Sequence, residues 1–471
     1  MFPLQFFVFC LFLMLLLYWR VFKGDILAPV ILIHFSFIGA ALLLLSGAER
    51  LEIKDFSYET TFILITGIEM FSFGSLLYRI PFLKRGTTYL KNTKITPLQT
   101  AWDGEIPIMV YILFVLFAAI VAYVQFKHEV AYVGYAGAFT EIVSDFRDDS
   151  VMFGVPQNPF VALGLRVIFV IQPFLLFFSF YNKIVCGNKW NHPFILILLF
   201  LAYIVCMFIM AGSRGRIFSI LFQIMFVLAI CYNLPKVQVI HKQIKEMHRA
   251  KRGISFNYAG SKILVKTGLV ISLIGIPTFY WVGVLQGKKY SEMTLFEPVE
   301  NYFSYGLIHL DHIVRTSVYV PKDFGGWSFP GYYGLLNKMG AGFQDYDNLP
   351  FYGRYGNTLT IFGRWYNDFG ILGVIIMAFL VGVFFSWIYY RMIYSRNLKT
   401  FVRFAVAYVF FMDIVLMASY DDWVKSKLSL NGAFQIVFLY ILLKNIVKNA
   451  KKRSIPPKTK KIICNSELRS S

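Results

Sequence analysis

Arginine side chains lie in or beside the segments that separate long apolar runs, where a bound phosphate could meet them. Arg166 lies inside the apolar run 159–181, about seven residues from its edge, or roughly 10 Å at 1.5 Å per residue. A charge at that depth in an apolar phase requires a partner or a function. The guanidinium group is planar and holds phosphate oxygens in pairs. We therefore predict that a phosphate-bearing ligand is bound by Arg166, Arg214, Arg216, Arg315, Arg354 and Arg364.

The segment from Gly212 to Arg216, with the sequence GSRGR, joins two apolar runs and is the sharpest local feature. Gly212 can end one helix and Ser213 can cap the next. The free N–H groups of that second helix would then face the same side as the two arginines, which favours an anion site. The alternative is a tight turn between helices whose arginines reach lipid headgroups.

A group-transfer reaction beside such an anion also benefits from a base that takes a proton from the acceptor hydroxyl. His312 is the first choice because it shares a helix face with Arg315, and Asp311 and Asp368 follow. Each of these residues could instead be a solvated loop residue or a helix cap. The same alternatives hold for His309, Asp345, Asp347, Asp421 and Asp422.

The apolar runs that must position these residues are long enough to cross a membrane. The chain has 471 residues, of which 57% are hydrophobic and only 15% are charged, against about 25% charged residues in soluble domains. A span needs about 20 apolar residues. The sequence predicts an all-α polytopic membrane protein with about eleven transmembrane helices and one large outer loop. The predicted spans are 2–19, 26–46, 59–78, 106–125, 159–181, 194–212, 217–234, 264–285, 369–390, 401–420 and 430–447.

The basic residues predict the orientation of these spans. Lysine and arginine gather in the segments 79–105 and 235–263 and in the tail 449–471, which the positive-inside rule assigns to the cytoplasm. The N-terminus is then outside. We divide the chain into a transmembrane domain, 1–448, and a basic cytoplasmic tail, 449–471, that we expect to be irregular. The segments expected outside are 47–58, 126–158, 213–216, 286–368 and 421–429.

The loop 286–368 is too long for a simple connection. Apolar residues from Val299 to Val314 recur at helical spacing and predict a helix after Pro298, which could lie on the membrane surface with its polar residues pointing away from the lipid. A packing helix of the loop is the alternative.

Other classes of function and site are disfavoured. The net charge of +20 comes from short loops and the tail and not from a nucleic-acid module, so no nucleic-acid partner is expected. The five cysteines lack metal-ligand spacing, and Asp345 and Asp347 are interpreted as part of a turn. We expect neither a metal nor another cofactor. Inside the spans, His34, Glu69 and Asp413 are interpreted as hydrogen-bonded packing residues, with a proton relay as the alternative for Glu69 and Asp413.

The GSRG turn, the long outer loop and the run from Tyr355 to Gly373 resemble the Wzy-type O-antigen and capsule repeat-unit polymerases. The resemblance covers the layout of spans over most of the chain. It implies a GT-C-like, metal-independent membrane glycosyltransferase of the bacterial cytoplasmic membrane. Its substrate would be an oligosaccharide repeat unit carried on undecaprenyl pyrophosphate at the outer face, to which the growing glycan is transferred. Membrane lipid, a chain-length regulator and a flippase are the implied partners.

Three other functions remain open. One is a structural or scaffold membrane protein, which would leave the outer arginines unexplained. A flippase of lipid-linked oligosaccharides usually has related halves, and no internal repeat is visible in this chain. An O-antigen ligase differs from a polymerase only in using the lipid A core as acceptor, which the sequence does not distinguish.

Overall fold

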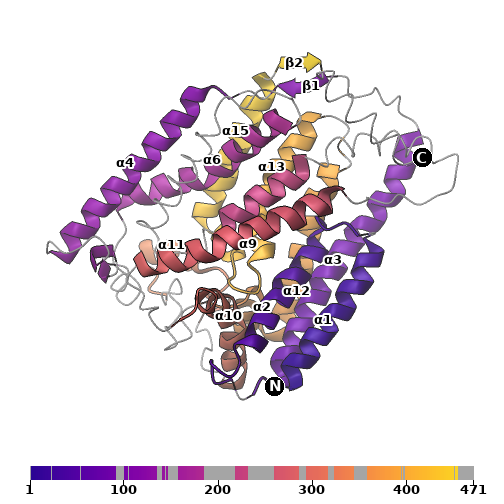
Figure 1. Cartoon of the computed structure of the whole chain (residues 1–471), viewed down its shortest axis with the longest axis vertical. Coiled ribbons are helices and arrows are strands. Elements are labelled where there is room, and N and C mark those ends of the chain that lie inside the picture. The colour runs from indigo at the N-terminus through magenta and orange to yellow at the C-terminus, as the bar shows by residue number, and fades with distance from the viewer. Residues whose placement is uncertain are drawn as a thin grey trace.

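The computed structural model of the chain is dominated by helices (Figure 1). It describes residues 2–22, 24–53, 55–91, 100–103, 106–134, 141–143, 145–146, 158–184, 218–231, 259–285, 293–316, 323–343, 358–393, 395, 398–449 and 451–454. The long helices are α1 (Phe2–Val21), α2 (Pro29–Ser46), α3 (Tyr58–Lys91), α4 (Ile108–Val133), α6 (Pro159–Ile184), α9 (Ala259–Leu285), α12 (Ile361–Ile393), α13 (Leu398–Leu416) and α15 (Leu430–Asn449). The remaining labelled elements are α10 (Glu297–Thr316), α11 (Pro330–Lys338), α14 (Val424–Leu428), β1 (Thr100–Asp103) and β2 (Lys451–Ser454).

Six described helices are long and apolar enough to cross a membrane, namely α1, α2, α4, α6, α12 and the Tyr58–Leu77 part of α3. Shorter apolar helices cover Phe218–Cys231, Ser272–Val284 and Leu430–Asn445. The predicted class of α-helical membrane protein is thereby confirmed, whereas the count of about eleven spans stays a prediction. The expected span 194–212 lies outside the described residues.

The closest helix crossing joins α3 to α12 and depends on glycine. A Cβ atom on Gly382 would lie 2.1 Å from the carbonyl oxygen of Phe71, and one on Gly74 would lie 2.3 Å from that of Phe379. Ser75 adds a hydrogen bond of 3.1 Å from its Oγ to the carbonyl oxygen of Gly382. Small residues of this kind let two backbones meet inside a membrane, where apolar burial between helices gives no driving force.

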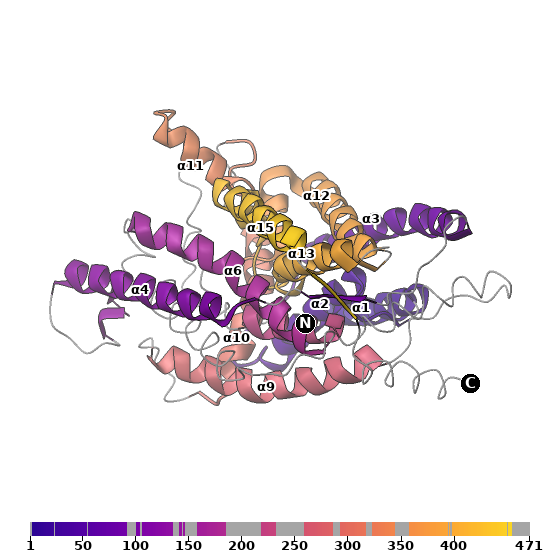
Figure 2. The ribbon, with the colours of Figure 1, turned by 90° about the horizontal axis from the view of Figure 1, so that it is seen from above.

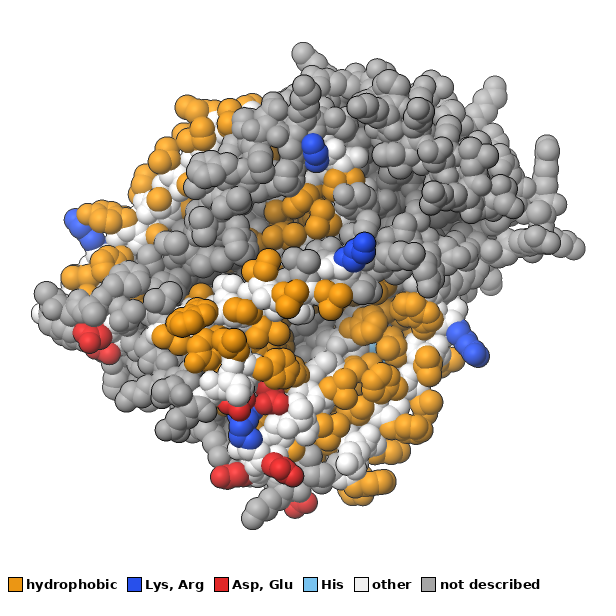
Figure 3. Space-filling model, viewed as in Figure 1, with side chains coloured by type: hydrophobic (Ala, Val, Ile, Leu, Met, Phe, Trp, Pro, Cys, Tyr) orange, Lys and Arg blue, Asp and Glu red, His pale blue; other side chains and the backbone are white. Residues whose placement is uncertain are grey.

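Contacts group the loops of the protein at two ends of the helix bundle. At one end, which we call the α10 end, the backbone N–H of Ile361 donates to the carbonyl oxygen of Ala418, and Gly306 packs on Ser419. At the other end, β1 pairs antiparallel with β2, so part of the tail that we expected to be irregular forms a strand. Each set joins described segments that the sequence predicted on one side of the membrane, and the orientation itself stays a prediction. Figure 3 shows most of the visible acidic side chains gathered toward the α10 end.

Helix α12 begins earlier than the sequence predicted. The outer loop was expected to continue to residue 368, but the helix starts at Ile361 and changes direction at Gly370, whose φ is +62°. Hydropathy places Arg364 and Asp368 outside a span because both are charged. In the structure both have polar partners at the α10 end, so a helix containing them is stable there.

The helix predicted after Pro298 is confirmed as α10, and residues on both of its faces are buried, as expected for a packing helix. Asn301, Ser304 and Asp311 from its polar face are buried, as are the apolar residues opposite. The buried carboxylate of Glu300 pairs with Arg50 and accepts a hydrogen bond from Ser46 at the end of α2. Polar side chains of α10 are therefore bonded to other segments of the protein, whereas the sequence suggested that they would face solvent.

Candidate functional site

The first two turns of α12 fasten the loop segment around Trp327. The carboxylate of Asp368 accepts hydrogen bonds from the backbone N–H groups of Trp327 at 3.1 Å and Ser328 at 2.5 Å. The guanidinium of Arg364, only 1% exposed, donates from Nη1 to the carbonyl oxygen of Trp327 at 3.3 Å. Arg364 and Asp368 therefore order this loop.

Two further titratable groups are buried in the electrostatic range of Arg364. Asp422 accepts a hydrogen bond of 2.9 Å from the backbone N–H of Val424, at the start of α14, and burial raises its pKa to about 7 although Arg364 lowers it. His309 on α10 has its Nδ1 2.7 Å from the carbonyl oxygen of Thr358, and burial lowers its pKa to about 4. We call Arg364, Asp368, Asp422 and His309 the buried charge cluster. A neutral His309 and a carboxyl that titrates near neutral pH are groups that can hold or move a proton.

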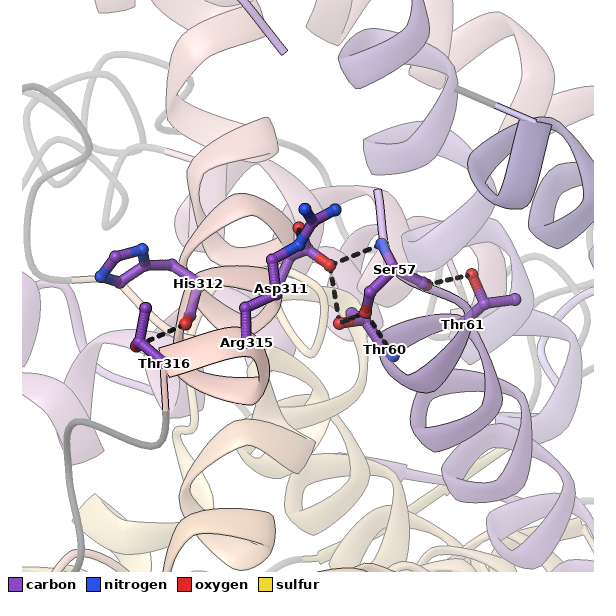
Figure 4. A network of polar contacts seen from close by, with 7 residues as sticks. All are labelled: Ser57, Thr60, Thr61, Asp311, His312, Arg315 and Thr316. Carbon is purple, nitrogen blue, oxygen red and sulfur yellow. Dashed lines mark hydrogen bonds and ion pairs between the residues drawn. The ribbon is translucent and has the colours of Figure 1, made fainter. Parts of the chain in front are cut away.

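Asp311 and Arg315 form a second polar network with the start of α3 (Figure 4). Asp311 accepts hydrogen bonds of 2.8 Å from the backbone N–H of Ser57 and from the hydroxyl of Thr60, and its other oxygen lies 2.8 Å from Nε of Arg315. Ser57 in turn accepts from the backbone N–H of Thr60, which is the bond of a helix N-cap. The carboxylate of Asp311 thus fastens α10 to the first turn of α3.

His312 lies on the same helix but points elsewhere. Figure 4 shows its imidazole directed away from the pair of Asp311 and Arg315, while its carbonyl oxygen accepts a hydrogen bond of 2.7 Å from Thr316. Its side chain is half-buried. Helical spacing placed His312 and Arg315 together, but the side-chain directions separate them.

A cavity of about 220 Å³ lies between α6, α14 and α15, large enough for several water molecules or a phosphate group. Two cationic side chains line it, Arg166 from α6 and Lys427 from α14. The other lining residues carry no acidic group and are Ala162, Leu165, Phe169, Ser426, Ser429, Asn431 and Gln435. We call this space the cationic cavity.

Three further features lie around the positive charges of the cationic cavity. Lys427 is held by the Oε1 atom of Gln435 at 3.4 Å and lies over the ring of Phe410, with Nζ 3.6 Å from its centroid. Helix α15 begins at the cavity, and Ser429 caps it by accepting from the backbone N–H of Gly432 at 3.1 Å. The positive end of that helix dipole therefore adds to the two side-chain charges.

The described residues bring only part of the predicted arginine set to this cavity. Arg166 lines it, whereas Arg315 is paired with Asp311 and Arg364 lies in the buried charge cluster. Arg214, Arg216 and Arg354 lie outside the described residues. Asp345 and Asp347 do as well, and within the described ranges no group of three His, Cys, Asp or Glu residues could hold a metal ion.

Sequence reasoning missed Lys427. A usable signal was present, because a short segment expected outside contains two lysines, Lys425 and Lys427, against the positive-inside trend. Inside the helices, Glu69 accepts a hydrogen bond from Tyr18 at 2.7 Å and Asp413 lies 3.4 Å from Nε2 of Gln223. His34 lies with Nδ1 2.7 Å from the carbonyl oxygen of Val30. These contacts agree with the interpretation of all three as hydrogen-bonded packing residues.

Comparison of the chain with protein-family models, with characterised proteins and with solved structures found no match. The fold therefore supports a class, an α-helical membrane protein. Anion binding at the cationic cavity and the specific activity are proposals.

Proposed function

We propose that this protein is a GT-C-like membrane glycosyltransferase that polymerises oligosaccharide repeat units of an O-antigen or capsular polysaccharide. The repeat units would be carried on undecaprenyl pyrophosphate at the outer face of the bacterial cytoplasmic membrane. The observation that carries the proposal is the cationic cavity, in which Arg166, Lys427 and the start of α15 supply positive charge without an acidic residue in the lining.

The proposed reaction needs little else from the protein. An acceptor hydroxyl of the incoming repeat unit attacks the anomeric carbon of the growing glycan, and the bond from that carbon to the pyrophosphate oxygen breaks. The acceptor proton passes to a base, and the leaving lipid pyrophosphate gains negative charge. Arg166 and Lys427 would stabilise that charge from side chains already in place at the cavity.

The predicted bases differ in the direction and the contacts of their side chains. Asp311 and Asp368 accept hydrogen bonds from the backbone of other segments, so we assign both a positioning role. His312 is half-buried and points away from the Asp311 network, and it remains our candidate for the base. Its substitution by glutamine should lower the rate without changing how much protein inserts into the membrane.

Reconstitution separates the proposal from its alternatives. The purified protein in phospholipid vesicles, supplied with the undecaprenyl-pyrophosphate-linked repeat unit alone, should give a ladder of glycans two or more repeats long. Single transfer that requires added lipid A core would indicate a ligase. Movement of the repeat unit across the bilayer without a new glycosidic bond would indicate a flippase, and either outcome would overturn the polymerase proposal.

A further inference from the structure

Three large apolar side chains around α11 are exposed to an unusual degree. Phe324 is 84% exposed, Tyr332 65% and Met339 75%. Figure 2 shows α11 projecting away from the other helices. We call these three residues the α11 apolar surface.

Contacts within this part of the chain fix the α11 apolar surface in its outward position. The hydroxyl of Tyr333 donates to the carbonyl oxygen of Phe324, and the ring of Phe324 packs edge-on against Phe369 at 4.8 Å between centroids. In the last turn of α11, the amide side chain of Asn337 donates to the carbonyl oxygen of Phe343 at 2.9 Å and accepts from its backbone N–H at 2.6 Å. The exposure therefore belongs to an ordered segment and requires an explanation.

The α11 apolar surface continues an exposed apolar face that runs along α15. Gly331 at the start of α11 packs on Ser429, where a Cβ atom on the glycine would lie 2.9 Å from the Cβ of the serine. On either side of Ser429, Leu428 and Leu430 are more than half exposed, and exposed apolar residues continue along α15 as Phe434 and Val437. Residues Leu430–Asn445 of α15 form one of the shorter apolar helices, and we infer that lipid covers their exposed apolar face.

We propose that the α11 apolar surface is a membrane-interface anchor that lies among the phospholipid headgroups at the α10 end. Tyrosine suits that region because its ring is apolar and its hydroxyl is polar. Phe324 and Met339 carry no group that could hydrogen-bond a sugar, which favours lipid over glycan as the occupant. Lys338, exposed beside Met339, places a positive charge where anionic headgroups lie.

The anchor also fixes the depth of the cationic cavity. Ser429 both contacts α11 and lines that cavity, so an α11 held at the interface keeps the Ser429 side of the cavity next to the headgroups. The anchor does not depend on the proposed polymerase activity, and a protein of another function would show it equally.

Spin-label depth measurements test the anchor. Single substitutions Tyr332→Cys and Met339→Cys are made in a variant whose five cysteines are replaced by serine or alanine, and the protein is placed in vesicles of phosphatidylethanolamine and phosphatidylglycerol. Val437→Cys on α15 is the lipid control, and Glu49→Cys, an exposed residue of the loop after α2, is the water control. We expect oxygen to relax labels at 332 and 339 at least threefold more, relative to a water-soluble nickel chelate, than the label at 49. Ratios equal to that of Glu49→Cys overturn the anchor. The anchor is also overturned if the ratios at 332 and 339 rise above that of Glu49→Cys only after glycan or another protein is added.

Hydroxyl-radical labelling of the unaltered protein in the same vesicles gives a second test that needs no substitution. Met339 is 75% exposed and Met293 is 36% exposed. If water covered both, Met339 would oxidise about twice as fast as Met293. We expect Met339 to oxidise more slowly than Met293, and the opposite order overturns the anchor.

Discussion

Arg364 and Asp368, one helical turn apart on α12, bind the same peptide segment, Arg364 through a carbonyl oxygen and Asp368 through N–H groups. Arg364 donates to the carbonyl oxygen of Trp327, and Asp368 accepts from the N–H groups of Trp327 and Ser328. Two charged residues thus enter the protein interior because each satisfies backbone atoms that would otherwise be buried without a bond. This relationship explains why a charged stretch forms the start of a long apolar helix.

Asp368→Ala should loosen the loop around Trp327. The substitution leaves two buried N–H groups without their acceptor, which costs about 1–3 kcal/mol each when nothing replaces it. We expect faster amide hydrogen exchange at Trp327 and Ser328 and a lower thermal midpoint. Asp368→Asn retains an acceptor oxygen and should be affected less. Unchanged exchange in Asp368→Ala would show that the loop is held by other contacts.

Much of the helical layout could be predicted from the sequence, but most of the site could not. A long apolar run is visible in the sequence itself, and such runs form helices in a membrane protein. Ten of the eleven predicted spans coincide at least in part with a described helix, and the eleventh lies outside the described residues. Lys427 was missed because its meeting with Arg166 depends on how α6 packs beside α15. The bond from Asp311 to Ser57 joins residues 254 positions apart, and helical periodicity carries no information on such a pair.

Gly382→Ala should separate α3 from α12. Its new methyl group would lie 2.1 Å from the carbonyl oxygen of Phe71, which is backbone and cannot turn aside. Overpacking of this kind costs about 1–3 kcal/mol, so the thermal midpoint should fall. The matched control is Gly39→Ala on α2, where no atom lies within 4 Å of the added Cβ and stability should be unchanged or improved. Equal stability of the two variants would contradict the close crossing.

Asp422→Asn should change how stability depends on pH. Burial raises the pKa of Asp422 from 3.8 to about 7, so the folded protein binds this proton more tightly than the unfolded chain. The contribution of this proton to the free energy of unfolding is therefore complete below pH 3.8 and is lost as pH rises through about 7. The difference between the two pKa values corresponds to about 4 kcal/mol at most. Asparagine keeps a neutral side chain at every pH.

The difference between the two proteins isolates this titration from that of other groups. The buried His309, with a pKa of about 4, acts in the opposite direction between pH 4 and 6.5 but is present in both proteins. We expect the thermal midpoint of Asp422→Asn minus that of the unaltered protein to increase from pH 4 to pH 8. A difference that is constant over this range would show that Asp422 titrates as an ordinary carboxyl.

Polymerisation by cavity variants tests the central claim most directly. Arg166→Ala and Lys427→Ala are compared in reconstituted vesicles with Lys266→Ala, an exposed cation on α9, with the amount of inserted protein matched. Loss of one contact to a developing negative charge lowers a rate about 10²–10³-fold. We expect that loss for each cavity variant, partial recovery in Arg166→Lys, and a normal rate for Lys266→Ala. A full glycan ladder from the double variant Arg166→Ala/Lys427→Ala would contradict the account.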